Sequence, residues 1–87
     1  MERDIIIAYD FTDGEIRYDN FKDEIYKYFE GKSKKPEDWL TNTTLILATK
    51  RLDKVDTLKD NFFKKIQDYN FKLDKFIIAE INSYSHL

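Results

Sequence analysis

Two carboxylates near the start of the chain are the residues best suited to chemistry. Asp10 follows the aliphatic run Ile5-Ile6-Ile7-Ala8-Tyr9, and Asp13 comes three residues later. An unbroken aliphatic run predicts a strand covered on both faces, and the next residue then lies at the rim of the sheet. A carboxylate there can bind a divalent cation, which prefers oxygen ligands. The same carboxylate can instead accept backbone hydrogen bonds in the turn toward the next helix, so both interpretations stay open.

The composition limits what these carboxylates can belong to. The 87 residues predict one domain spanning 1–87, because a chain of this length buries only about 60 to 65% of its unfolded surface. The 15 Lys and Arg are outnumbered by 17 Asp and Glu, which excludes a strongly basic DNA-binding module and requires any nucleic-acid contact to be local. With no Cys and one His, carboxylates are the remaining metal ligands.

The start of the chain predicts its location. The charged segment Met1-Glu2-Arg3-Asp4 is followed by an apolar run that is too short for a signal sequence or a membrane span. We therefore expect a cytoplasmic protein with no membrane association.

Hydrophobic spacing and turn residues give the order of the elements. Apolar residues with helical spacing predict two helices, and aliphatic or Thr-rich runs predict the strands. The expected elements are a strand over 4–9, a turn over 11–17, a helix from Asp19 or Asn20 to Gly31, a polar loop over 31–38, extended residues 39–40, a strand over 43–49, a helix over 55–69 capped by Asp53 or Asp56, a turn over 70–74 and a strand over 76–81.

This order predicts an α+β fold. Strand, helix, hairpin, helix and strand combine most simply as a ferredoxin-like βαββαβ domain, with a four-stranded antiparallel sheet and two helices on one face. The other face then lacks a cover, although strands 5–9 and 43–49 are apolar on both sides. We therefore expect a homodimer across the open face, with residues 82–87 as a tail that can add to it.

Basic residues near the strand ends are candidates for phosphate contact. Lys50 and Arg51 follow the second long strand, and Arg17 follows Asp13 by four residues. Such side chains can reach a nucleic-acid backbone. Lysines of the loop over 31–38 can do the same, or they can form an ordinary solvated basic loop.

The first strand and its continuation resemble a known family. Tyr9-Asp10 at the strand end, then Phe11-Thr12-Asp13 and a helix, resemble the opening signature of the CRISPR-associated protein 2 family. Trp39 and the later strand 43–49 are more similar to the SinR-like relatives of that family. Its members are small ferredoxin-like homodimers that include metal-dependent nucleases.

The resemblance implies a site and a role. Asp10 would be the catalytic residue, meeting its symmetry mate at the dimer interface and binding one Mg²⁺ that activates water against a phosphodiester. Asp13 would be a further metal ligand. Arg17, Lys50 and Arg51 would contact the nucleic acid, and the protein would serve antiviral defence.

Three functional classes follow from these expectations. The first is a Mg²⁺-dependent endonuclease or ribonuclease. The second is a non-catalytic homodimer that scaffolds a nucleic-acid-processing complex. The third is a small acidic interaction protein, for example one encoded by a phage or mobile element, that binds and inhibits a protein complex.

Overall fold

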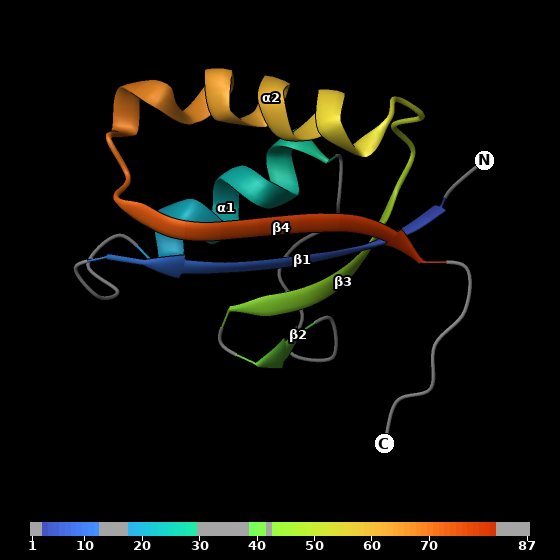
Figure 1. Ribbon diagram of the computed structural model, residues 1–87, viewed down its shortest axis with the longest axis horizontal. Helices are drawn as coiled ribbons and strands as arrows, with labels where there is room; N and C mark the ends of the chain where they lie inside the picture. Colours follow the sequence, from blue (N-terminus) through green and yellow to red (C-terminus); the bar gives the residue numbers. More distant parts are fainter. Residues whose placement is uncertain (1–2, 13–17, 30–38, 42, 82–87) are drawn as a thin grey trace.

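The computed structural model describes residues 3–12, 18–29, 39–41 and 43–81. Their elements follow the predicted order (Figure 1). They are β1 (Arg3–Phe11), α1 (Tyr18–Tyr28), β2 (Trp39–Thr41), β3 (Thr44–Thr49), α2 (Val55–Ile66), the 3₁₀ turn η2 (Gln67–Tyr69) and β4 (Leu73–Ile81). The predicted α+β class is confirmed, with four antiparallel strands and two helices.

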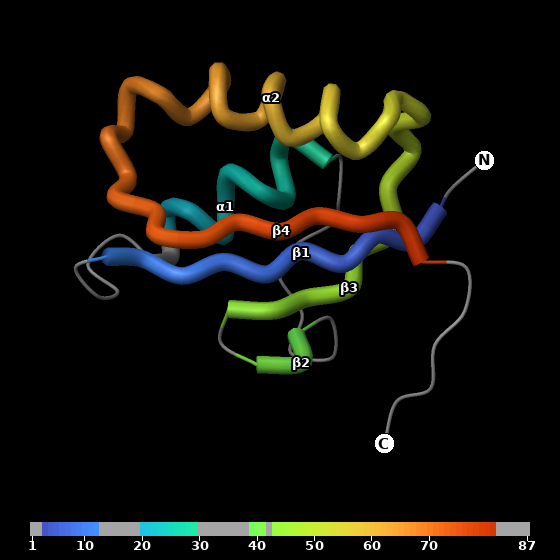
Figure 2. The backbone as a smooth tube through the Cα atoms, viewed as in Figure 1, coloured from blue at the N-terminus to red at the C-terminus, as the bar shows by residue number. Residues whose placement is uncertain are grey.

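The strands form one open sheet in the order β2-β3-β1-β4 (Figure 1). β1 lies in the interior and pairs antiparallel with both β3 and β4. Its residue Ile7 lies between Leu45 on one side and Ile78 on the other. The aliphatic run of β1 is thus matched by aliphatic strands on both sides. After β3 the chain runs through α2 and returns along β4 (Figure 2).

The core lies between the two helices and one face of the sheet. Ile5, Ile7 and Tyr9 point to this face of β1 and are buried, because side chains alternate between the faces of a strand. Each helix contributes residues at three- and four-residue spacing, which form one stripe on its surface. These are Phe21, Ile25 and Phe29 from α1 and its C-terminal end, and Leu58, Phe62 and Ile66 from α2. Both helices therefore cover the same face.

Aromatic side chains hold the layers together. The Phe62 ring centroid lies 5.7 Å from that of Phe21 in α1 and 5.8 Å from that of Phe76 in β4. Rings at such distances add roughly 0.5 to 1.5 kcal/mol per pair beyond the burial of their area. Phe62 thus joins α2 to both the other helix and the sheet.

Three predicted boundaries are corrected. α1 begins at Tyr18, so Asp19 and Asn20 lie within the helix rather than capping it. β4 begins at Leu73, because the extension of β1 to Phe11 supplies a pairing partner for Leu73. The N-cap residue of α2 is Lys54, which makes no side-chain capping hydrogen bond. Asp53 precedes that position, and its backbone carbonyl accepts a hydrogen bond from Arg3.

The sheet face opposite the helices is apolar and partly exposed. Its register places seven apolar residues on this open face, together with Asp4 and Thr44; the apolar residues are Ile6, Ala8, Ile46, Ala48, Ile77, Ala79 and Ile81. Ile77 has a relative exposure of 60%. Contiguous apolar surface of this kind marks an interaction site more often than isolated apolar residues do.

Candidate functional site

Asp10 lies on the open face, near the end of β1. It is exposed, and it follows Ile6 and Ala8 on the same side of the strand. Its direct cross-strand partner is Lys75 of β4, which is also exposed. Directly opposed residues share a face and have Cβ atoms about 4.5 to 5.5 Å apart. The structure therefore places a basic residue directly opposite the predicted metal ligand in the β1–β4 register.

The pairing becomes irregular immediately beyond Asp10. Asp10 pairs with Lys75, but Phe11 pairs with Leu73, so Asp74 has no opposite residue in β1. An extra residue of this kind is a β-bulge, which bends the strand and increases its twist. The bulge ends the regular part of the β1–β4 ladder at the Asp10–Lys75 pair.

Two hydrogen bonds hold the chain beyond this pair. The backbone N–H of Thr12 and its hydroxyl both donate to the Lys72 carbonyl oxygen, each at 2.7 Å. Tyr9 fixes the strand on the other side of Asp10, because its N–H donates to the Thr43 carbonyl at 3.0 Å. Its ring packs against Phe21 at 4.6 Å. The backbone is therefore fixed by hydrogen bonds on both sides of Asp10.

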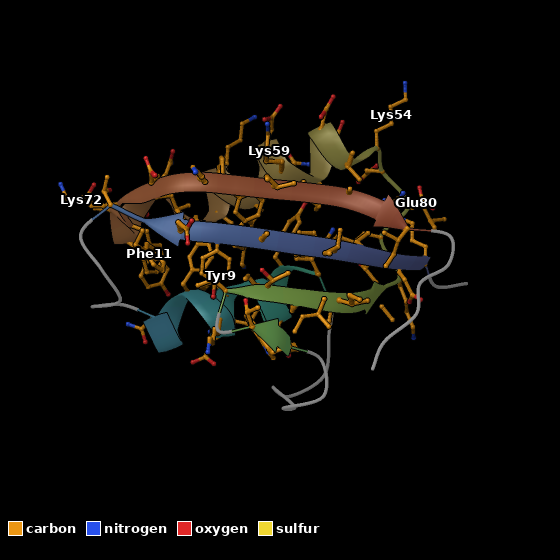
Figure 3. The ribbon with its side chains drawn as sticks, turned by 60° about the horizontal axis from the view of Figure 1, so that its bottom comes forward. Tyr9, Phe11, Lys54, Lys59, Lys72 and Glu80 are labelled. Carbon is orange, nitrogen blue, oxygen red and sulfur yellow. The ribbon has the colours of Figure 1, made fainter. Side chains whose placement is uncertain are left out.

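Lys50 and Arg51 lie at the other end of the sheet from Asp10. The β1–β3 register pairs Arg3 with Thr49, just before these two residues. Asp10 follows Arg3 by seven positions along the strand, which corresponds to about 23 Å. Figure 3 shows Phe11 and Lys72 at one end of the sheet and Glu80 at the other. Within one chain, the predicted carboxylate and these predicted phosphate contacts do not form one site.

The Arg51 side chain is engaged within the fold. Its guanidinium Nε donates to the Tyr28 carbonyl, and Cζ lies 4.1 Å from the Tyr28 ring centroid. A cation at the last carbonyls of a helix satisfies acceptors that lack an intrahelical donor. Lys50 is exposed, and it forms no ion pair with the part of the chain described above.

Arg3 extends this network to the loop before α2. Its Nε donates to the Arg51 carbonyl at 3.1 Å, and one terminal nitrogen donates to the Asp53 carbonyl. The other terminal nitrogen lies 3.3 Å from Glu80 Oε1. Arg3 therefore joins β1, β4 and the β3–α2 connection, which is a structural role that the sequence pattern did not indicate.

A buried carboxylate lies on the helix side. Glu24 of α1 has a relative exposure of 5%, accepts a hydrogen bond from the Tyr69 hydroxyl at 2.7 Å and lies 3.6 Å from Lys27 Nζ. That hydrogen bond, and then the charge of the carboxylate, raise the pKa of Tyr69. The burial of Glu24 was not predicted from the sequence, although its position between Phe21 and Ile25 in the apolar stripe of the helix indicated it.

Asp13 and Arg17 lie outside the described residues, as do the loop over 31–38 and the tail 82–87. Among the residues that are described, no three His, Asp or Glu side chains come together as a metal-binding group. Asp10 supplies one carboxylate, and the basic residue Lys75 lies opposite it in β4. The predicted magnesium site, which needs Asp10 from two copies, stays a prediction.

Comparison with protein-family models, curated proteins and solved structures found no match for this chain. Over the described ranges, neither α1 nor α2 combines the length and the hydropathy needed to cross a bilayer.

Proposed function

We propose that the chain is a ferredoxin-like protein that forms a homodimer through the open face of its sheet and acts as a non-catalytic, nucleic-acid-binding part of a larger complex. The strand order and the two helices on one face support the ferredoxin-like assignment. Among the three expected functions the proposal takes the non-catalytic scaffold, because a basic residue, Lys75, lies opposite Asp10 in the β1–β4 register.

The apolar open face carries the proposal. A sheet with helices on one side gains stability when its other apolar side is covered, and burial contributes roughly 25 cal/mol per Å². A second copy is the occupant we propose, because this end of the face bears one acidic and one basic group, Asp10 and Lys75. Such a surface is electrostatically compatible with itself, as an isologous interface requires.

Nucleic-acid contact is supported by the resemblance and by Lys50. The exposed Lys50 follows β3, whereas the Arg51 guanidinium already contacts Tyr28. We therefore assign a phosphate contact to Lys50 and a structural role to Arg51. A single phosphate contact changes the slope of log affinity against log salt by about 0.7 for single-stranded nucleic acid.

Dimer formation is tested by placing a charge on the open face. Ile77→Glu introduces a carboxylate at a position that is 60% exposed, and Leu52→Glu is the matched control at a position that is 68% exposed and outside the sheet. We expect light scattering to give a dimer for the wild type and Leu52→Glu, and a monomer for Ile77→Glu. A dimer that survives Ile77→Glu would place the interface elsewhere.

Nucleic-acid binding is tested separately by fluorescence anisotropy with a labelled single-stranded oligonucleotide at several salt concentrations. We expect affinity to decrease with salt and the slope to fall by about 0.7 in Lys50→Gln. Lys64→Gln on α2 is the control for the loss of one positive charge. Wild-type protein that retains no oligonucleotide at low salt would contradict this part of the proposal.

The acidic interaction protein is the second candidate function. It is favoured by the formal net charge of −2 and by the use of the Arg51 guanidinium inside the fold. It differs from the first in its prediction for oligonucleotides, because a protein that binds another protein through an acidic surface repels the phosphate backbone. Absence of oligonucleotide binding at low salt therefore favours this second function.

A further inference from the structure

The pattern of large and small residues along β1 and β4 points to a specific packing of the two copies. On the open face, Ile6 pairs with Ala79 and Ala8 pairs with Ile77. Each of these two pairs combines one Ile with one Ala, and the large residue changes strand from one pair to the next; the pair before them on this face is Asp4 with Ile81. The following pair on the same face, Asp10 with Lys75, combines opposite charges.

We infer that the twofold axis of the dimer runs parallel to the strands and lies between the two packed sheets, opposite the line midway between β1 and β4. β1 of one copy then faces β4 of the other. This inference rests on the proposed homodimer. Rotation by 180° about such an axis keeps each residue at its level along the strands and exchanges the two strands. Every residue then faces the counterpart of its own cross-strand partner.

The resulting contacts are complementary in size. Ala8 of one copy faces Ile77 of the second copy, and Ile6 faces Ala79 of the second copy. Large side chains opposite small ones allow two sheets to interdigitate at their usual spacing of about 10 Å. The contacts occur twice, because the axis repeats each of them.

The same axis brings opposite charges together at the Asp10 end of the face, whereas Asp4 at the other end faces Ile81 of the second copy. Asp10 of one copy faces Lys75 of the second copy, and the reverse pair forms across the axis. Lys75 thus supplies the positive charge for Asp10 at the interface, in the place where the resemblance would put a metal ion. Neither side chain makes an ion pair within the described part of its own chain, so both can form the contact between copies.

An axis between β1 and β3 is the main alternative, and it fits less well. It would bring Ile6 against Ile46 of the second copy and Ala8 against Thr44, because those residues are cross-strand partners in that pair. It would give Asp10 no basic partner in β3, since the β1–β3 register ends at Ala8.

In the inferred packing only β1 and β4 overlap with the second copy. This makes a small interface, for which we expect a dissociation constant of about micromolar.

Charge exchange tests this packing. We would measure the dimer dissociation constant by sedimentation equilibrium for Asp10→Lys, Lys75→Asp and the double exchange. We expect each single change to weaken the dimer at least tenfold, because it opposes like charges twice per dimer, and the double exchange to restore it. The control pair is Asp60→Lys and Lys64→Asp, two exposed positions one helical turn apart on α2.

Thermal unfolding of each variant at a concentration where it is monomeric separates interface effects from folding effects. If the charge exchange acts only within one chain, it will change the thermal stability of the monomer and leave the dimer dissociation constant unchanged. A wild-type dimer that tolerates both single changes would overturn the inferred axis and leave the homodimer standing. A wild type that is monomeric at all concentrations would overturn the axis and the homodimer together.

Discussion

Thr49 donates a hydrogen bond from its hydroxyl to the Phe29 carbonyl at 2.9 Å, and it thereby joins the end of β3 to the end of α1. The same oxygen accepts the Arg51 N–H at 3.1 Å. Thr49 and Phe29 are both fully buried, so water cannot replace the hydroxyl as a donor to the Phe29 carbonyl. This residue fixes the position from which Lys50 leaves the sheet.

Thr49→Val tests that role. The substitution keeps the shape but leaves the buried Phe29 carbonyl without its donor, which costs about 1 to 3 kcal/mol of unfolding free energy. Urea denaturation measures the change. Thr57→Val at an exposed position of α2 is the control, and an equal effect of the two substitutions would contradict the proposed role.

Arg51 and Lys50 are predicted to behave differently although they are adjacent. Arg51→Gln removes the cation from the Tyr28 ring and from the end of α1, so we expect a lower free energy of unfolding and an unchanged salt slope of oligonucleotide binding. Lys50→Gln should show the reverse pattern. Urea denaturation and fluorescence anisotropy of both variants decide the assignment, and a reduced slope in Arg51→Gln would restore its predicted nucleic-acid contact.

Phe62→Ala tests the centre of the core. Phe62 is fully buried and packs against both Phe21 and Phe76, so its truncation should cost about 3 to 5 kcal/mol. The neighbouring Phe63 is half-buried, and Phe63→Ala should cost clearly less in the same denaturant experiment. A larger loss in Phe63→Ala would mean that α2 presents a different face to the sheet.

The raised pKa of Tyr69 predicts that the folded protein loses stability at alkaline pH. Its pKa is raised in the folded protein above the ordinary 10.0, first by the hydrogen bond to Glu24. The folded state therefore holds the Tyr69 proton more tightly than the unfolded state does, so the contribution is complete below pH 10.0 and is lost as pH rises through the folded-state pKa. Denaturation across this range should show a steeper loss for the wild type than for Tyr69→Phe. Parallel curves for the two proteins would contradict the prediction.

Magnesium separates the scaffold from the nuclease. With Lys75 beside Asp10, we expect Mg²⁺ neither to strengthen the dimer nor to produce cleavage of a labelled oligonucleotide. The measurement is a gel assay with Mg²⁺ or Mn²⁺, using Asp10→Ala and the α2 control Asp60→Ala. Metal-dependent cleavage that disappears only in Asp10→Ala would support the catalytic role implied by the resemblance and contradict our choice.

The local patterns of the sequence were sufficient to predict the order of the helices and strands and most of the core residues. The aliphatic run before Asp10 predicted β1, and the spacing of Phe21, Ile25 and Phe29 predicted the buried side of α1. These features depend on neighbours within a few residues, which periodicity detects directly.

The candidate site depended on pairings that periodicity does not contain. Lys75 stands opposite Asp10 because β4 pairs with β1 in one register, and that register is a contact between segments distant in the sequence. The engagement of Arg51 likewise depends on the end of α1 lying beside the end of β3. The sequence named Asp10, Lys50 and Arg51 as candidates one by one, and only the fold shows that Asp10 lies at the opposite end of the sheet from Lys50 and Arg51.

The most direct test of the account is an isotope-filtered NOE experiment on a mixture of ¹³C-labelled and unlabelled chains, which detects contacts between copies only. The account predicts NOEs from the Ala8 methyl group of one copy to the Ile77 methyl groups of the other, and from Ile6 to Ala79. Absence of these signals at concentrations where the protein is dimeric, or contacts from Ile6 to Ile46 in their place, would contradict it.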